Sequence, residues 1–322
     1  MSALDLDIEL LQRFERGLDA RHPERSRIPA RVLGYGEIST VFEIQAEGLQ
    51  GLAFKRLPLF DTWDQVERYR VVHEEYVRLL SEEVGLHLPP HSHAIVLRRA
   101  GQPVFYIVQR QFPTGSIGNQ ALHHLSQQDT CHLLWRVLQE MSKVWAFNRG
   151  QTRLQLAIDA QVSNWAIAGS DLETLCLDDA QLWYLDTSTP LLQLNGVEQL
   201  DVELFMRSAP SFLAWILRLV FLKDVVNRYY DPHLLTVDLV ANLYKEQRPD
   251  LIPDAVNLVS DFCAGHAGSE LAPITADEVR AYYREDALIW TLYLSMRQVD
   301  RVLRTRLLRR EYPYILPPRI KR

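Results

Sequence analysis

The stretch from Leu33 to Lys55, LGYGEISTVFEIQAEGLQGLAFK, constrains the fold of this chain more than any other. Its strand-forming residues and turn signals predict a β-hairpin that enters at residues 31–37, continues through 39–46, turns at 47–51 and returns along 52–57. Gly34 and Gly36 lack a Cβ atom, so the backbone there can approach another strand or a phosphate closely. Lys55 lies on the returning strand.

The rest of the chain divides into two kinds of pattern. The first part is predicted to contain a long helix at residues 61–83 and two strands at 93–100 and 103–111, followed by a linker at 112–119. The second part is predicted to contain a helix at 128–148, short strands at 154–190 and further helices at 197–308. We therefore expect an α+β protein of two lobes. Residues 1–112 would form a β-rich N-terminal lobe with one long helix, and residues 113–322 a mostly helical C-terminal lobe.

Composition limits the classes of function. The chain of 322 residues is long enough to bury a sizeable core, and its net charge of −6 argues against general affinity for nucleic acid. Its three cysteines lack the CxxC spacing of a zinc or redox site, which favours a reducing compartment. The N-terminus lacks the apolar core of a signal peptide, and residues 212–222 are too short to span a bilayer. We expect a cytoplasmic protein.

Polar residues follow two apolar stretches in the second half of the chain. Asp159 follows Leu156-Ala157-Ile158, Asn164 comes five residues later, and Asp186 ends the strand-like stretch 182–185. Acids at the ends of neighbouring strands would point into one cleft. An Asp and an Asn there supply the oxygen ligands that Mg²⁺ prefers, while the other Asp can take a proton from an attacking hydroxyl.

The order of these parts resembles the protein-kinase-like superfamily. The pattern comprises Gly34-x-Gly36-x-x-Ser39-x-Val41, Lys55, a helix acid, Asp159-(x)4-Asn164 and Asp186. The resemblance implies a bilobal kinase-like fold that binds ATP and Mg²⁺ in the cleft between its lobes. It implies that Lys55 holds the α- and β-phosphates, that Asp159 is the catalytic base, and that Asn164 and Asp186 bind Mg²⁺.

The resemblance also implies an acid on the long helix and a hinge beside the adenine. The acid that pairs with Lys55 would be Glu75 or Glu74; we favour Glu75, because Leu79 follows it by four residues and shares its inward face. The hinge beside the adenine would run from Gln109 to Phe112 and would offer backbone groups to the base.

Several positions depart from the pattern of a protein kinase. Ser39 stands where a third glycine is common, Ala157-Ile158 replaces His-Arg before the catalytic Asp, and Thr187-Ser188 replaces Phe-Gly after Asp186. No Ala-Pro-Glu follows. The chain is therefore more similar to small-molecule kinases of the aminoglycoside or choline phosphotransferase type than to conventional protein kinases.

The main functional hypothesis is an ATP- and Mg²⁺-dependent phosphotransferase acting on a hydroxyl of an unidentified, small-molecule acceptor. Two alternatives stay open: a kinase-like pseudoenzyme that serves as an interaction module, and a nucleotidyl transferase on the same fold. Each motif alone also has a structural explanation as a tight strand crossing, an edge lysine or a turn. The basic tail, residues 301–322, is expected to be a helix that faces solvent or meets an anionic partner.

Overall fold

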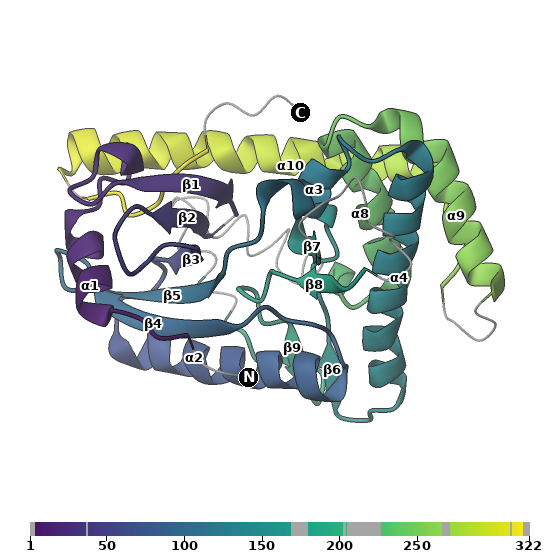
Figure 1. The fold of residues 1–322 in the computed structure, drawn as a ribbon, viewed down its shortest axis with the longest axis horizontal. Helices are drawn as coiled ribbons and strands as arrows, with labels where there is room; N and C mark the ends of the chain where they lie inside the picture. The colour runs from purple at the N-terminus through teal and green to yellow at the C-terminus, as the bar shows by residue number, and fades with distance from the viewer. Residues whose placement is uncertain are drawn as a thin grey trace.

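Five antiparallel strands form the main sheet of the molecule. The computed structural model describes residues 4–36, 38–168, 180–201, 204, 227–265, 271–309 and 311–317. The strands are β1 (Ala30–Tyr35), β2 (Thr40–Ile44), β3 (Leu52–Leu57), β4 (His91–Leu97) and β5 (Pro103–Arg110), in the order β1-β2-β3-β5-β4. The five-stranded sheet predicted from the sequence is confirmed (Figure 1).

Strand β5, which lies between β3 and β4, shows how an N-terminal helix and the long helix α2 (Trp63–Arg78) cover the two faces of this sheet. Its side chains alternate between faces, as a strand requires. Tyr106 and Val108 pack with Phe14 of α1 (Ile8–Gly17), while Phe105 and Ile107 belong to the cluster that includes the inner side of α2. Residues 103–108 are all buried, because each face of β5 has its own apolar cover.

The predicted long helix is confirmed and has two sections. α2 (Trp63–Arg78) begins with a capping box, in which Thr62 and Gln65 satisfy each other's backbone N–H groups. A π-helical turn, η2 (Leu79–Glu83), continues it. The wider turn shifts the phase of the residues that follow Glu83 relative to those of α2.

The second part of the chain is mainly helical, as expected. Its elements are η3 (Thr114–Ser116), α3 (Gly118–Ala121), α4 (Gln127–Arg149), β6 (Leu154–Leu156), η4 (Val162–Asn164), β7 (Trp165–Ile167), β8 (Leu182–Tyr184), β9 (Leu192–Leu194), β10 (Val197–Glu198), α8 (Pro232–Lys245), η5 (Pro249–Leu251), α9 (Ile252–Gly265) and α10 (Ala276–Val302); η1 (Pro23–Arg25) follows α1. The prediction of helix from residue 197 onward is wrong at its start, because Val197 and Glu198 pair with β9.

The hydrophobic clusters do not divide at residue 112. Tyr76 and Leu80, at the end of the long helix, share one core with Leu138 of α4 and with Leu156. In Figure 1, α2 accordingly runs from beneath the sheet toward β9 and β6. The boundary between lobes at 112 and 113 stays a prediction, and the long helix joins the two sides of it.

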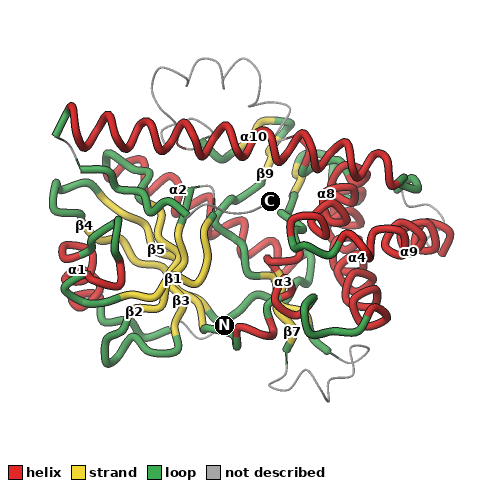
Figure 2. The backbone as a smooth tube through the Cα atoms, turned by 90° about the horizontal axis from the view of Figure 1, so that it is seen from above, coloured by secondary structure: helices red, strands yellow, loops and turns green. Residues whose placement is uncertain are grey.

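The C-terminal segment returns to the sheet instead of continuing as a basic helix. α10 runs along the long axis of the molecule (Figure 2). A π-turn, η6 (Leu303–Leu307), ends the helical structure, and residues 311–317 have no helix or strand. Tyr312, Tyr314 and Ile315 are buried in the two clusters of the sheet. The predicted helical tail is therefore wrong for the described residues 308–309 and 311–317, because apolar residues of this segment pack into the core. Residues 310 and 318–322 of the predicted tail lie outside the described residues.

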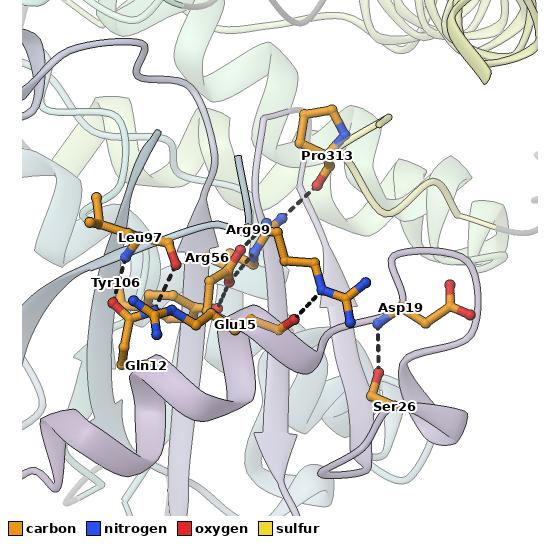
Figure 3. Close-up of polar contacts among 10 residues, drawn as sticks. Gln12, Glu15, Asp19, Ser26, Arg56, Leu97, Arg99, Tyr106 and Pro313 are labelled. Atoms are coloured by element: carbon orange, nitrogen blue, oxygen red, sulfur yellow. Dashed lines mark hydrogen bonds and ion pairs between the residues drawn. The ribbon is translucent and has the colours of Figure 1, made fainter. Parts of the chain in front are cut away.

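A buried network fastens this segment to the sheet (Figure 3). Arg56 donates from Nε and Nη2 to the two carboxylate oxygens of Glu15 at 2.8 and 2.6 Å, and from Nη1 to the carbonyl of Pro313 at 2.6 Å. Tyr106 donates its hydroxyl to the same carboxylate. Every charged atom of the pair thus has a partner, as burial of an ion pair requires.

The described helices contain none that is both long and apolar enough to cross a bilayer. The apolar stretch at residues 212–222 lies outside the described residues.

Candidate active site

Lys55, on the main sheet, forms an ion pair with Asp186, in the second part of the chain. The Lys55 Nζ atom on β3 lies 2.7 Å from Asp186 Oδ1, and the two side chains are 16% and 22% exposed. Asp186 follows β8, as the sequence predicted. The same Oδ1 atom accepts hydrogen bonds from the backbone N–H and the hydroxyl of Ser188. Oδ1 therefore holds the loop and the lysine together, and Oδ2 makes none of these contacts.

Asp159 lies at the start of a loop fixed by β8. Its backbone N–H donates to the hydroxyl of Tyr184 at 3.1 Å, and its Oδ1 accepts from the N–H of Gln161 at 3.1 Å. The loop is thereby held close to Asp186, whose charge acts on Asp159. The structure brings together the two acids that the sequence placed at the ends of separate strands.

Asn164 connects the loops of the two acids. Its side-chain Nδ2 donates to the Asp159 carbonyl at 3.1 Å, and its own carbonyl accepts from the N–H of Leu185 at 2.8 Å. The preceding turn packs tightly, since a Cβ atom on Gly118 would lie 2.3 Å from the Val162 carbonyl. Asn164 Oδ1, the atom predicted to bind metal, makes none of these hydrogen bonds.

The surroundings shift the pKa values of the two acids in opposite directions. Burial and the nearby charge of Asp186 raise the pKa of Asp159 from 3.8 to about 6. Burial would also raise the pKa of Asp186, but the charge and hydrogen bonds of Lys55 and Ser188 outweigh it and lower the pKa. Asp186 therefore stays ionised more readily than Asp159, a division typical of paired carboxylates with different chemical tasks.

The prediction for the helix acid is wrong. Glu75 lies 48% exposed and pairs with Arg78 at 3.0 Å, while Glu74 pairs with Arg70 at 2.7 Å on the outer surface. The prediction took its phase from Leu79 alone, whereas the buried positions Tyr69, His73 and Tyr76 define the inward face of α2. The residue of α2 that reaches the site is His73, which is buried and has Nε2 3.1 Å from Thr187 Oγ1.

The glycine-containing hairpin is more closed than a phosphate-binding loop requires. The Gly36 N–H donates to the Ser39 carbonyl at 3.0 Å, and a Cβ atom on Gly36 would meet Ser39 Oγ at 2.7 Å. A Cβ atom on Gly34 would meet nothing within 4 Å. Val41 lies opposite Lys55 across β2 and β3. The roles of these four residues toward a nucleotide stay predictions.

The predicted hinge is partly occupied by protein contacts. Gln109 pairs with strands on both sides, and its side-chain Nε2 donates to the Leu185 carbonyl at 3.1 Å. The Phe112 ring packs against Trp183, with centroids 5.9 Å apart. Both residues thus touch the segment that leads into Asp186. That the backbone of this segment meets an adenine stays a prediction.

Sequence reasoning missed a further, half-buried acid, Asp238 of α8. Burial and the nearby charges of Asp159 and Asp286 raise its pKa from 3.8 to about 8, against the opposing charge of Lys245. Lys245 donates to Gln161 Oε1 at 2.6 Å, so it also anchors the Asp159 loop. No motif marked these residues, since their proximity depends on how α8 packs.

The donor atoms suit Mg²⁺ when phosphates complete its coordination. In the described part of the chain, no group of three or more His, Cys, Asp or Glu residues is arranged to hold a metal. Mg²⁺ usually takes one or two protein oxygens together with waters and substrate phosphates. Asp186 Oδ2 and Asn164 Oδ1 are such oxygens, and the donor set therefore fits a metal bound with a nucleotide.

The structure brings together the parts on which the predicted resemblance rests: a five-stranded sheet carries Lys55, and loops of a helical part carry the acids. A model of a family of unknown function (DUF6206) matches residues 16–301. The chain belongs to this family. A search of curated proteins gave no match.

Two solved structures are among those found to be similar to this chain. One is WaaP in complex with acyl carrier protein, at 14% identity and a TM-score of 0.33, covering 78% of this chain and 97% of that one. The other is the GDP complex of a mutant of aminoglycoside 2'-phosphotransferase-IIIa, at 12% identity and a TM-score of 0.33, covering 74% and 93%.

Proposed function

We propose that this protein is an ATP- and Mg²⁺-dependent phosphotransferase that acts on a hydroxyl of a small-molecule acceptor in the cytoplasm. The observation that carries the proposal is the contact between Lys55 Nζ and Asp186 Oδ1 beside Asp159. A cation, a strongly ionised carboxylate and a more basic carboxylate in one place are the groups that phosphoryl transfer needs.

Each residue has a distinct task in this proposal. Lys55 binds the phosphates of the nucleotide, and Asp186 and Asn164 hold Mg²⁺, which neutralises phosphate charge. Asp159 accepts the proton of the acceptor hydroxyl, for which a carboxylate with a pKa of about 6 is a better base than an ordinary one. The hydrogen bond from Gln161 orients that carboxylate.

A thermal-shift experiment tests binding. ATP with Mg²⁺ should raise the melting temperature by mass action, and Asp186→Asn should abolish the Mg²⁺-dependent part. Glu75→Gln is the matched control, because that acid pairs with Arg78 at the surface and should keep the full shift. Absence of any shift in the native protein at millimolar ATP or GTP would overturn the proposal.

Turnover is tested separately with Asp159→Asn. This variant should bind ATP with Mg²⁺ as the native protein does, yet lose about 10²–10⁴-fold in transfer rate, the usual contribution of a general base. Product analysis decides the leaving group: ADP supports phosphoryl transfer, whereas pyrophosphate would show nucleotidyl transfer.

One observation favours the second candidate, a kinase-like protein that binds nucleotide without transferring phosphate. Within the described part of the chain, the ion pair of Lys55 is with Asp186, and the acids of α2 point outward. Binding of ATP without release of ADP by the native protein, across a panel of hydroxyl acceptors, would support this candidate.

A further inference from the structure

The inward face of α2 carries three buried rings with polar tips: Tyr69, His73 and Tyr76. Their spacing of four and three residues puts them on one side of the helix. All three point toward the loops of the candidate site. Tyr76 donates its hydroxyl to the Ala157 carbonyl at 2.7 Å, two residues before Asp159.

The other two rings contact the segment directly after Asp186. Tyr69 donates its hydroxyl to the Ser188 carbonyl at 2.8 Å, and His73 Nε2 lies 3.1 Å from Thr187 Oγ1. One helix therefore holds the loop of the proposed base and the loop of the proposed metal ligand. It does so through neutral hydrogen bonds and without an ion pair to Lys55.

The neutrality of His73 suits its neighbours. Burial, followed by the charges of His91, His93 and Lys55, lowers its pKa to about 3, although Asp186 opposes this shift. A carboxylate on this face would compete with Asp186 for the lysine, because both would be acids beside one cation. A neutral imidazole does not compete with Asp186 for the ion pair with Lys55.

We propose that His73 is a positioning residue of the active site: by holding Thr187 from α2, it fixes Asp186 in the orientation that binds Mg²⁺. In this proposal the hydrogen bond between His73 and Thr187 connects α2 to the site. An acid on α2 paired with Lys55 would make the same connection through an ion pair. This inference rests on the function proposed above.

The test compares four variants: His73→Leu, His73→Gln, Thr187→Val and the double variant His73→Leu/Thr187→Val. Loss of one hydrogen bond should lower the background hydrolysis of ATP about 10-fold in His73→Leu and reduce the Mg²⁺-dependent thermal shift, while the shift with ATP alone persists. Glutamine reaches the same distance with an amide and should restore most of both. The double variant should lose no more than either single variant.

His93→Leu is the matched control. Its ring stacks on Phe105 at 5.5 Å, much as His73 packs on Phe105 at 5.7 Å, but its Nε2 lies 3.3 Å from Glu74 and so faces away from the loop. The control should leave ATP hydrolysis and both shifts unchanged. Equal losses in His93→Leu and His73→Leu would overturn the inference, as would failure of glutamine to restore either readout or independent, multiplying effects in the double variant.

Amide hydrogen exchange of residues 186–188 without nucleotide separates this inference from the proposed function. His73→Leu should speed exchange of the Ser188 N–H, which is bonded to Asp186 Oδ1, by about 10-fold. Faster exchange in a protein that binds no nucleotide would overturn the function and keep the positioning role. Unchanged exchange in an active protein would overturn the positioning role alone.

Discussion

Lys55 and Arg56 are neighbours on β3, yet they serve opposite faces of the sheet. Arg56 and Glu15 are 3% and 1% exposed, whereas Lys55 and Asp186 are 16% and 22% exposed. The guanidinium group of Arg56 donates hydrogen bonds to the Glu15 carboxylate and to the Pro313 carbonyl. Among the described residues, Lys55 forms its ion pair with Oδ1 of Asp186, and Oδ2 of that carboxylate makes none of the contacts described above.

The difference indicates that the Arg56–Glu15 pair stabilises the fold, whereas the Lys55–Asp186 pair is suited to a reaction. Guanidinium groups stay charged and bind carboxylates in two places, so they suit permanent buried pairs. A lysine ammonium is a compact charge on a flexible stem, and it can move from a carboxylate to a phosphate. Two cations one residue apart thus differ in role because strand geometry sends them to different surroundings.

The largest expected effect tests the buried pair. Arg56→Met should lower the free energy of unfolding by about 3–5 kcal/mol, because it leaves the Glu15 carboxylate buried without its cation. Denaturation in urea measures the loss. Arg31→Met is the control: Arg31 is 56% exposed in its pair with Glu43, and its loss should be below about 1 kcal/mol. Equal losses would remove the distinction between core and surface pairs.

The second prediction concerns the C-terminal segment that Arg56 fastens. Ile315→Ala should cost about 2–4 kcal/mol, since its side chain lies in the cluster of the sheet and α1. Ile8→Ala on α1, where the side chain is 44% exposed, is the control and should cost far less. A negligible loss for Ile315→Ala would mean that the segment does not belong to the core.

The third prediction tests a half-buried acid, Asp238, which lacks the bidentate arginine partner that Glu15 has. The raised pKa of Asp238 means that the folded state binds its proton more tightly than the unfolded state does, so stability falls as pH rises from about 4 to about 8. Asp238→Asn removes this fall. It should stabilise the protein at pH 8 by on the order of 1 kcal/mol or more, with no gain at pH 4. Thermal unfolding at both pH values decides; a loss at pH 8 would contradict the assignment.

The smallest effect on stability is expected at Lys55. Lys55→Met should change the free energy of unfolding by no more than about 1 kcal/mol, because Asp186 keeps its bonds to Ser188 and its access to water. The same variant should lose most of the stabilisation by ATP with Mg²⁺. If Lys55→Met instead destabilises as strongly as Arg56→Met, the cleft pair is structural as well.

The sequence alone determined the strands, the long helix and the chain order of Lys55, Asp159, Asn164 and Asp186. These features rest on local periodicity and on polar residues at strand ends, which act over a few residues. The meeting of Lys55 with Asp186 was predicted through resemblance to a known order of parts, and no local pattern contained it.

Only the tertiary structure decided which residue of α2 faces the site and where the C-terminus goes. The buried face of α2 is the one that carries Tyr69, His73 and Tyr76, so Glu75, two residues after His73, lies outside. The contact of Arg56 with Pro313 joins residues 257 positions apart. Such a contact depends on which apolar surfaces remain uncovered after the rest has packed, and that is a property of the whole fold.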